Sequence, residues 1–208
     1  MEKEEEHGVL QGYKKTVFFV LLLSVLLFVL RDFWGMSTER LTEMIGQGLI
    51  DRYIVARYIS LIGAILLGVI YFLFYYYAVT YIISIITDIP FKRIQKVQIY
   101  VIPTLLLFNF LEFIIFSIIQ FVPLFSPFSI AAIVAQFTPN LWVLYFFNQI
   151  ACSTVITIMI HYTFLAQWID EGRKSLLIKL IGVQIFLAAM VATFSTSPFI
   201  EWIERGLS

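Results

Sequence analysis

The stretch TVFFVLLLSVLLFVL, residues 16–30, decides the fold class of this chain because it is uninterrupted by any charge. A lysine pair precedes it, and Arg31 and Asp32 follow it at once. The same zoning recurs along the sequence: charges lie in short bands between long apolar runs, and only Glu112 enters the middle of a run. A charge at the bilayer centre costs about 2.5–3.5 kcal/mol, so the zoning indicates a chain that lipid solvates.

The composition excludes several classes of protein. Of the 208 residues, 61% are hydrophobic and 13% are charged, whereas soluble domains carry about 25% charged residues. The formal net charge of zero argues against a nucleic-acid partner, since such domains carry a basic excess. The single cysteine, Cys152, lies in an apolar run and supports neither an intramolecular disulfide nor a cysteine-rich metal site.

We expect an all-α integral membrane bundle of five transmembrane helices with amphipathic interfacial segments. A membrane-spanning helix needs about 20 apolar residues, and five segments qualify. The predicted spans are residues 15–34, 57–86, 98–121, 141–168 and 176–196. They form one membrane domain over residues 16–196, between a cytoplasmic N-terminal arm (1–15) and an interfacial outer tail (197–208).

The distribution of basic residues predicts the orientation. Lysines and arginines are frequent in the N-terminal arm, in residues 92–96 and in residues 173–179, whereas residues 122–140 contain none. Basic residues of short loops stay on the cytoplasmic side, so we expect a multi-pass protein of the cell membrane with its N-terminus inside and its C-terminus outside. The first loop fits this rule least, because acids of similar number accompany its arginines, which are Arg31, Arg40, Arg52 and Arg57.

Two further segments are predicted to lie at the membrane surface. Residues 37–49 have apolar positions at helical spacing after Ser37, which is a suitable helix cap. Residues 128–138 are apolar but too short to cross, and Pro127 and Pro139 bracket them. This second segment is expected to be either a surface segment or a re-entrant one.

A stripe of small residues marks one face of the second predicted span. Ser60, Ala64 and Gly68 recur at every fourth position, so they share a helix face that another backbone can approach closely. We expect this face to be a helix-packing contact.

Glu112 is the sharpest candidate for chemistry within the membrane. Asn109 precedes it by three residues and shares its helix face. At about 1.5 Å per residue, Glu112 lies roughly 13 Å below the outer end of its span, and Asn148 and Gln149 lie about 11 Å below theirs. His161 and Gln184 form a second polar layer, each about 10–12 Å from the cytoplasmic side.

Two interpretations of these polar residues remain open. They can form a path for protons or a substrate, because ionisable groups within a membrane are candidates for function. Alternatively, a protonated Glu112 can hydrogen-bond Asn148 or Gln149 and hold two helices together, which we favour. His161 alone is a poor metal site, since zinc normally takes three or four ligands, and we expect no metal or cofactor.

The sequence contains no familiar catalytic motif. His-Glu-x-x-His, Gly-x-Ser-x-Gly and a glycine-rich phosphate loop are all missing. We therefore predict a protein that is not an enzyme.

The layout resembles the bacterial branch of the Yip1 domain family, whose members are five-span integral membrane proteins. The resemblance rests on an outer loop that opens Met36-Ser37-Thr38-Glu39, a loop Pro90-Phe91-Lys92-Arg93, a third span with Val101-Ile102-Pro103, and a short Arg173-Lys174 loop before the last span. The Asp-Leu-Tyr-Gly-Pro segment of the eukaryotic members is absent. The resemblance implies a non-enzymatic membrane protein, and some bacterial relatives accompany ABC-type exporters.

We therefore expect a scaffold or accessory subunit that binds other integral membrane proteins, for example an ABC-type exporter, within the lipid bilayer. The alternative is a small transporter or channel with a polar path around Glu112.

Overall fold

The computed structural model describes residues 2–34, 50–119, 124–169 and 172–197. Apart from one isolated β-bridge, every regular element in these ranges is helical, which confirms the predicted all-α class for them. The predicted surface helix over residues 37–49 and most of the predicted tail lie outside the described residues. The chain divides into two compact units, residues 1–81 with 91–122 and residues 82–90 with 123–208, which are described one at a time.

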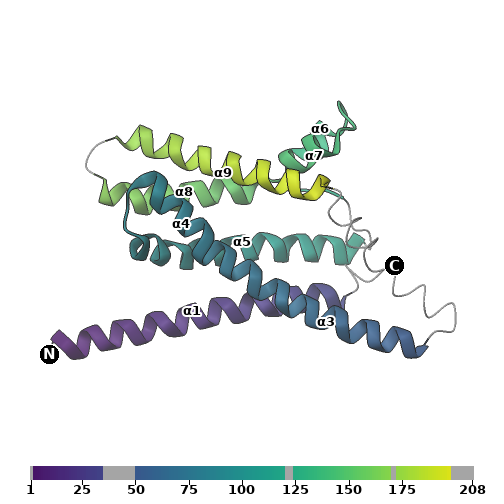
Figure 1. Ribbon diagram of the computed structural model, residues 1–208, viewed down its shortest axis with the longest axis horizontal. Coiled ribbons are helices and arrows are strands. Elements are labelled where there is room, and N and C mark those ends of the chain that lie inside the picture. The colour runs from purple at the N-terminus through teal and green to yellow at the C-terminus, as the bar shows by residue number, and fades with distance from the viewer. Residues whose placement is uncertain (1, 35–49, 120–123, 170–171, 198–208) are drawn as a thin grey trace. The chain divides into compact units, whose positions relative to one another are not determined.

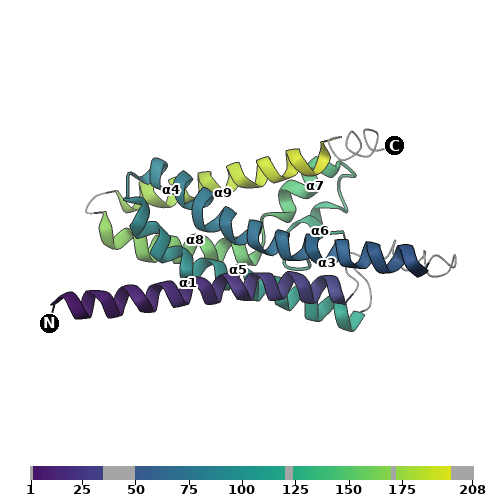
Figure 2. The same cartoon turned by 60° about the horizontal axis from the view of Figure 1, so that its bottom comes forward.

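Unit 1 is built on three long helical segments. They are α1 (Glu2–Phe33), α3 (Ile50–Leu73) with its π-helical continuation η1 (Phe74–Val79), and α5 (Phe91–Ile119). Figures 1 and 2 show α1 and α3 side by side in opposite directions, with α5 running parallel to α1. Because α1 begins at Glu2, the helix extends back through the predicted N-terminal arm.

The core of unit 1 lies where these three segments meet. Its buried members come from all three: Val20, Leu27, Phe72, Tyr76, Ile102 and Leu106. The hydroxyl groups of Tyr13 and Tyr76 lie 2.9 Å apart and add a polar contact between α1 and η1. The burial of large apolar side chains and one tyrosine pair thus fixes the three segments against one another.

The backbones of α1 and α3 come into close contact at Gly68. A Cβ atom placed on Gly68 would lie 2.7 Å from the Cα atom of Val25. The buried hydroxyl of Ser24 donates a hydrogen bond of 2.9 Å to the carbonyl oxygen of Gly68. A glycine and a serine therefore let the two backbones touch, as small residues do in packed membrane helices.

Unit 2 contains the remaining helices. They are α6 (Ala131–Val134), α7 (Leu141–Asn148), α8 (Cys152–Leu165), the 3-10 turn η2 (Ala166–Trp168) and α9 (Arg173–Thr196). The short helix α4 (Thr80–Thr87) continues η1 and carries the chain from unit 1 into unit 2. Both α7 and α8 pack on α9, and the indole of Trp142 donates to the hydroxyl of Thr193 at 3.2 Å.

Four helical segments among the described residues are long and apolar enough to cross a membrane. They are Gly12–Phe33, Tyr53–Thr87, Phe91–Ile119 and Arg173–Thr196. The second has 35 residues, which is about 52 Å of helix and well beyond a hydrocarbon core of about 30 Å. The predicted fourth span, residues 141–168, is not one continuous helix, because it breaks between α7 and α8.

The break between α7 and α8 is closed by backbone pairing with an earlier segment. The amide of Cys152 donates to the carbonyl of Phe128 at 3.1 Å, and the amide of Ile130 donates to the carbonyl of Ile150 at 3.2 Å. These bonds surround the β-bridge between Ser129 and Ala151. The apolar segment predicted over residues 128–138 therefore supplies partners for backbone groups that an interrupted helix leaves free.

The close contact at Gly68 predicts the effect of adding one methyl group. Gly68→Ala should lower the free energy of unfolding by about 1–3 kcal/mol, because the new Cβ atom overpacks against the backbone of α1. Unfolding in mixed detergent micelles measures the change. Gly182→Ala is the matched control, since nothing lies within 4 Å of a Cβ atom placed there. Equal stability of the two variants would contradict the close packing.

Candidate functional site

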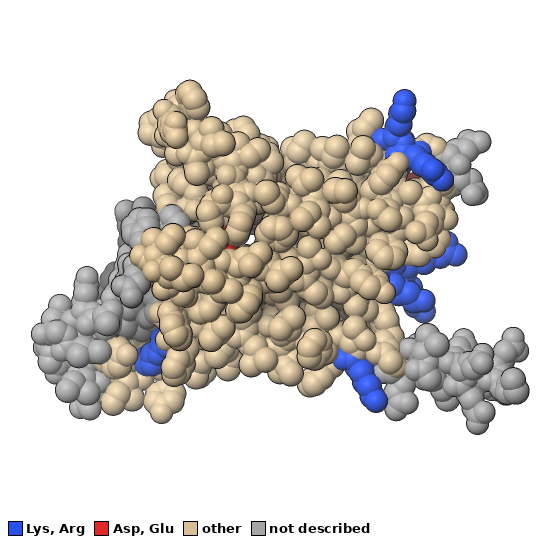
Figure 3. Space-filling view, turned by 180° about the vertical axis from the view of Figure 1, so that it is seen from behind, with Lys and Arg blue, Asp and Glu red and all other residues tan. Residues whose placement is uncertain are grey.

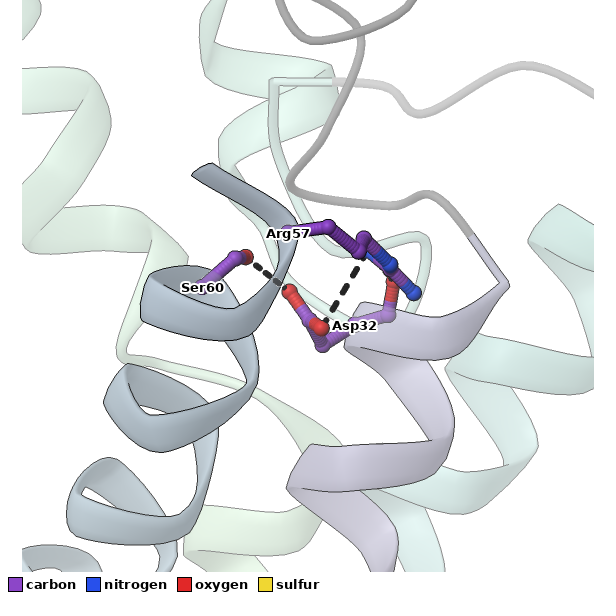
Figure 4. Close-up of polar contacts among 3 residues, drawn as sticks. All are labelled: Asp32, Arg57 and Ser60. Atoms are coloured by element: carbon purple, nitrogen blue, oxygen red, sulfur yellow. Dashed lines mark hydrogen bonds and ion pairs between the residues drawn. The ribbon is translucent and has the colours of Figure 1, made fainter. Parts of the chain in front are cut away.

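A buried charge pair joins the end of α1 to α3 and forms the centre of the candidate site. Asp32 is 3% exposed, and its Oδ2 atom lies 3.3 Å from Nη1 of Arg57. The hydroxyl of Ser60 donates to Oδ1 of Asp32 at 2.5 Å. Figure 4 shows Arg57 and Ser60 reaching Asp32 from neighbouring turns of α3. We call these three residues the Asp32 clasp.

Arg57 also completes the C-terminal end of α1. Its Nη1 atom donates to the carbonyl oxygen of Asp32 at 3.0 Å, and its guanidinium lies 5.5 Å from the ring centroid of Phe33. A helix C-terminus leaves carbonyl groups without helical partners and carries a partial negative charge, so it attracts a cation. The positive charge of Arg57 therefore offsets two negative charges, the partial charge at the C-terminus of α1 and the carboxylate of Asp32. Without Arg57, the helix dipole would disfavour a carboxylate at this position.

A second polar group connects α1, α3 and α5 beside the clasp. Nη1 of Arg31 donates to Oδ1 of Asn109 at 3.4 Å, and Nδ2 of Asn109 donates to the hydroxyl of Tyr71 at 3.3 Å. The same Nδ2 atom also donates to the carbonyl oxygen of Leu105 at 3.1 Å. Asn109 is thus the residue through which all three helices share hydrogen bonds.

A pocket lies between α1 and α3 next to the clasp. Its volume is about 420 Å³. Arg31, Asp32 and Ser60 form one part of its wall, and Phe28 and Leu67 form another. Gly63 and Ala64 complete the lining. The pocket therefore joins charged groups to an apolar cleft within unit 1.

The structure places the predicted packing residues on the α1-facing part of α3. Ala64 is buried, Gly68 contacts the backbone of α1, and Ser60 binds Asp32. The stripe Ser60, Ala64 and Gly68 thus combines a packing contact with one arm of the clasp.

The predicted outer polar layer divides between the two units. Asn109 and Glu112 belong to unit 1, and Asn148 and Gln149 belong to unit 2. Glu112 is half-buried on α5 and has an interaction partner. A bond from Glu112 to Asn148 or Gln149 would cross from one unit to the other, and it stays a prediction.

Within unit 2, Asn148 and Gln149 both serve the break in the predicted fourth span. Oδ1 of Asn148 accepts a hydrogen bond of 2.8 Å from the amide of Ser126. The carbonyl oxygen of Gln149 accepts one from the hydroxyl of Thr154 at 2.5 Å. Both residues therefore hold the non-helical turn between α7 and α8 in place.

The predicted inner layer contains a buried histidine, His161, and only one of its two ring nitrogens has a hydrogen-bond partner among the described residues. Nδ1 of His161 lies 3.0 Å from the carbonyl oxygen of Thr157, one turn earlier on α8. Its Nε2 atom has no hydrogen-bond partner among the residues that the structure describes. Gln184 is half-buried on α9, and no hydrogen bond joins the two side chains in the described part of unit 2.

The described ranges contain no group of three or more His, Cys, Asp or Glu side chains placed to hold a metal ion. Cys152 is exposed at the start of α8. The polar contacts described for the site are an ion pair and hydrogen bonds between helices.

The clasp is the feature that sequence reasoning missed. In the sequence, Arg31, Asp32 and Arg57 count only as charges of the first loop that balance one another. Ser60 is assigned there to helix packing alone. A signal was present: Arg57 and Ser60 lie three residues apart at the start of the second span and so share a face. An acid that ends the first span lies opposite them when the two spans are antiparallel.

Comparison with known proteins yields no match: no protein-family model, no curated protein and no solved structure matches this chain. The class that the fold defines is an all-helical protein with four described helices of membrane-spanning length.

The clasp predicts a large loss of stability when its anion is removed. Asp32→Asn should lower the free energy of unfolding by about 3 kcal/mol, the low end for a broken buried pair, since the Arg57 side chain is 24% exposed. Unfolding in mixed micelles is the measurement. Lys92→Ala, at an exposed basic residue, is the control and should be near neutral.

A double-mutant cycle separates the ion pair from other effects of the substitution. Adding Arg57→Gln to Asp32→Asn should cost less than the sum of the two single changes. Strict additivity would show that the pair contributes nothing to stability.

Proposed function

We propose that this chain is a non-enzymatic multi-pass membrane protein of Yip1 type that serves as a scaffold or accessory subunit for other membrane proteins, for example an ABC-type exporter. The observation that carries the proposal is the small share of its apolar helices that is buried within the chain. In the most apolar 18-residue stretch of Tyr53–Thr87 only 17% is buried. A helix with so little internal packing offers most of its surface to lipid or to another protein.

The exposed surface of α3 is continuous. Residues at helical spacing on one face are all exposed: Val55, Tyr58, Ile59, Ile62, Leu66 and Ile70. This face is distinct from the one that packs on α1, which contains Ala64 and Gly68. Seen from behind, most of the visible surface of the molecule likewise carries neither acidic nor basic side chains (Figure 3). The exposed face of α3 suits contact with another apolar helix, where van der Waals packing drives association.

The proposed topology keeps five crossings, with α7 and α8 as two halves of one broken span. Both halves pack on α9, and residues 128–130 pair with the backbone at the break. Irregular backbone is tolerated at membrane depth where it is buried in protein or lines a water-filled cavity, and the pairing with residues 128–130 supports this arrangement. The N-terminus would then face the cytoplasm and the C-terminus the outside of the cell membrane, as the basic loops indicate.

The alternative function is a small transporter or channel with a path around Glu112. The specific observation in its favour is the break between α7 and α8, because discontinuous helices often form the substrate sites of transporters. The hydrogen bonds from Arg31 through Asn109 to Tyr71 also place polar groups within apolar helices.

Purification in a mild detergent tests the accessory role. We expect one membrane protein to copurify at near-equal stoichiometry. Ile62→Trp should reduce the recovery of this partner, because the bulky indole disturbs the exposed face of α3. Ile178→Trp, on the exposed surface of α9, is the matched control. A homogeneous monomer without any partner would contradict the proposal. Loss of the partner in the control alone would place the contact on α9.

Reconstitution into liposomes tests the alternative. If Glu112 carries protons, Glu112→Gln should abolish proton flux driven by a pH gradient, because an amide does not titrate. Ser117→Ala is the control on the same helix, since among the described residues the Ser117 hydroxyl donates to the carbonyl oxygen of Phe113, within its own helix. Equal flux through the native chain and Glu112→Gln would exclude protonation of Glu112 from the mechanism.

A further inference from the structure

The pocket between α1 and α3 changes character along its length. Its polar part is formed by Arg31, Asp32 and Ser60. Its apolar part is formed by Phe28 and Leu67. Phe28 lies one turn before Arg31 on α1, and Leu67 lies seven residues after Ser60 on α3. At about 1.5 Å per residue, these offsets are roughly 5–10 Å along the helix axes. The pocket thus runs from charged groups to hydrocarbon.

This order matches the order of environments in a membrane. The polar part lies at the end of the membrane-length segment Gly12–Phe33, beside Trp34, a residue type that favours the headgroup layer. The apolar part lies further inside the same segment. A molecule that fits the pocket therefore has a polar head at the membrane boundary and a hydrocarbon chain directed into the bilayer.

Arg31 gives the polar part an affinity for anions. Its guanidinium has five N–H donors, and its hydrogen bond to Asn109 uses Nη1. The carboxylate of Asp32 is already held by Arg57 and Ser60, so Arg31 is not required to neutralise it. Glu112, one turn beyond Asn109, is not among the residues that line the pocket. Guanidinium groups bind phosphate oxygens in a bidentate geometry.

Gly63 keeps the pocket open. Nothing lies within 4 Å of a Cβ atom placed on this residue, whereas Gly68, five residues later, has no such space. The pocket volume of about 420 Å³ falls in the range of about 300–1,000 Å³ for small-molecule sites. The hollow therefore has room for part of a lipid chain.

We propose that this pocket binds one phospholipid, with the phosphate diester at Arg31 and one acyl chain along Phe28, Gly63 and Leu67. The proposal depends on the membrane setting of α1 and α3 and is independent of the scaffold role. A partner helix, from a second copy or another protein, is the competing occupant of the same cleft.

Native mass spectrometry of the full chain tests the proposal with two variants. After titration with phosphatidylglycerol in detergent, the native chain should retain one tightly bound lipid. Gly63→Leu should bind that lipid about tenfold more weakly, because its side chain fills the pocket. Gly182→Leu, which adds the same group at an equally open position on α9, should bind as the native chain does. A galactolipid with the same acyl chains lacks the phosphate and should bind more weakly to the native chain.

Two results would overturn the assignment. Equal lipid retention by Gly63→Leu and Gly182→Leu would remove the pocket as the site. A native dimer that Gly63→Leu abolishes, with lipid retention unchanged, would assign the cleft to a second copy.

Photocrosslinking of the native chain keeps the test independent of whether Gly63→Leu folds. A phospholipid with a photoreactive acyl chain should label the peptide that contains residues 60–67. Labelling confined to other peptides would contradict the proposal.

Discussion

A helix end leaves backbone groups that need hydrogen-bond partners, and this demand shapes the structure at two helix ends in particular. Inside the long helices the peptide groups largely pair with one another, with an exception at Pro103 in α5, because proline has no amide hydrogen. At the end of α1, Arg57 donates to the carbonyl oxygen of Asp32. At the break between α7 and α8, the backbone of residues 128–130 provides the missing partners. At both helix ends another part of the chain supplies the partner that the helix itself lacks.

The Asp32 clasp follows from this demand. A carboxylate at a helix C-terminus faces the negative end of the dipole and is nearly excluded from water, so it is stable only with close donors. Arg57 and Ser60 provide them from one face of α3. The closure of one helix end thereby determines how α1 and α3 are aligned. Such a charge pair fixes geometry more than it adds stability, because desolvation offsets much of its attraction.

The helical class and four of the five long apolar segments were predictable, because the transfer of an apolar side chain out of water is a local property of the sequence. The break near Gln149 was not, since it depends on pairing with a segment about twenty residues earlier, and no apolar pattern encodes that contact. The expected contact between Asn148 and Glu112 stays a prediction. The bond that Asn148 accepts from the amide of Ser126 was not foreseen, because it too depends on how the chain turns back on itself. Asp32 was overlooked because charge counting treats a loop as solvated, while helix packing buries this carboxylate.

Two glycines of α3 show how one residue type can close one part of an interface and open another. At Gly68 the missing side chain lets the backbone of α1 approach to contact distance, so the space is filled by protein. At Gly63, just over one turn away, the missing side chain leaves space that α1 does not fill. The clasp holds the helices together at the end nearer Gly63, so the opening there persists beside a fixed contact. A fixed contact next to a small hollow favours the binding of a ligand, because less ordering remains to oppose it.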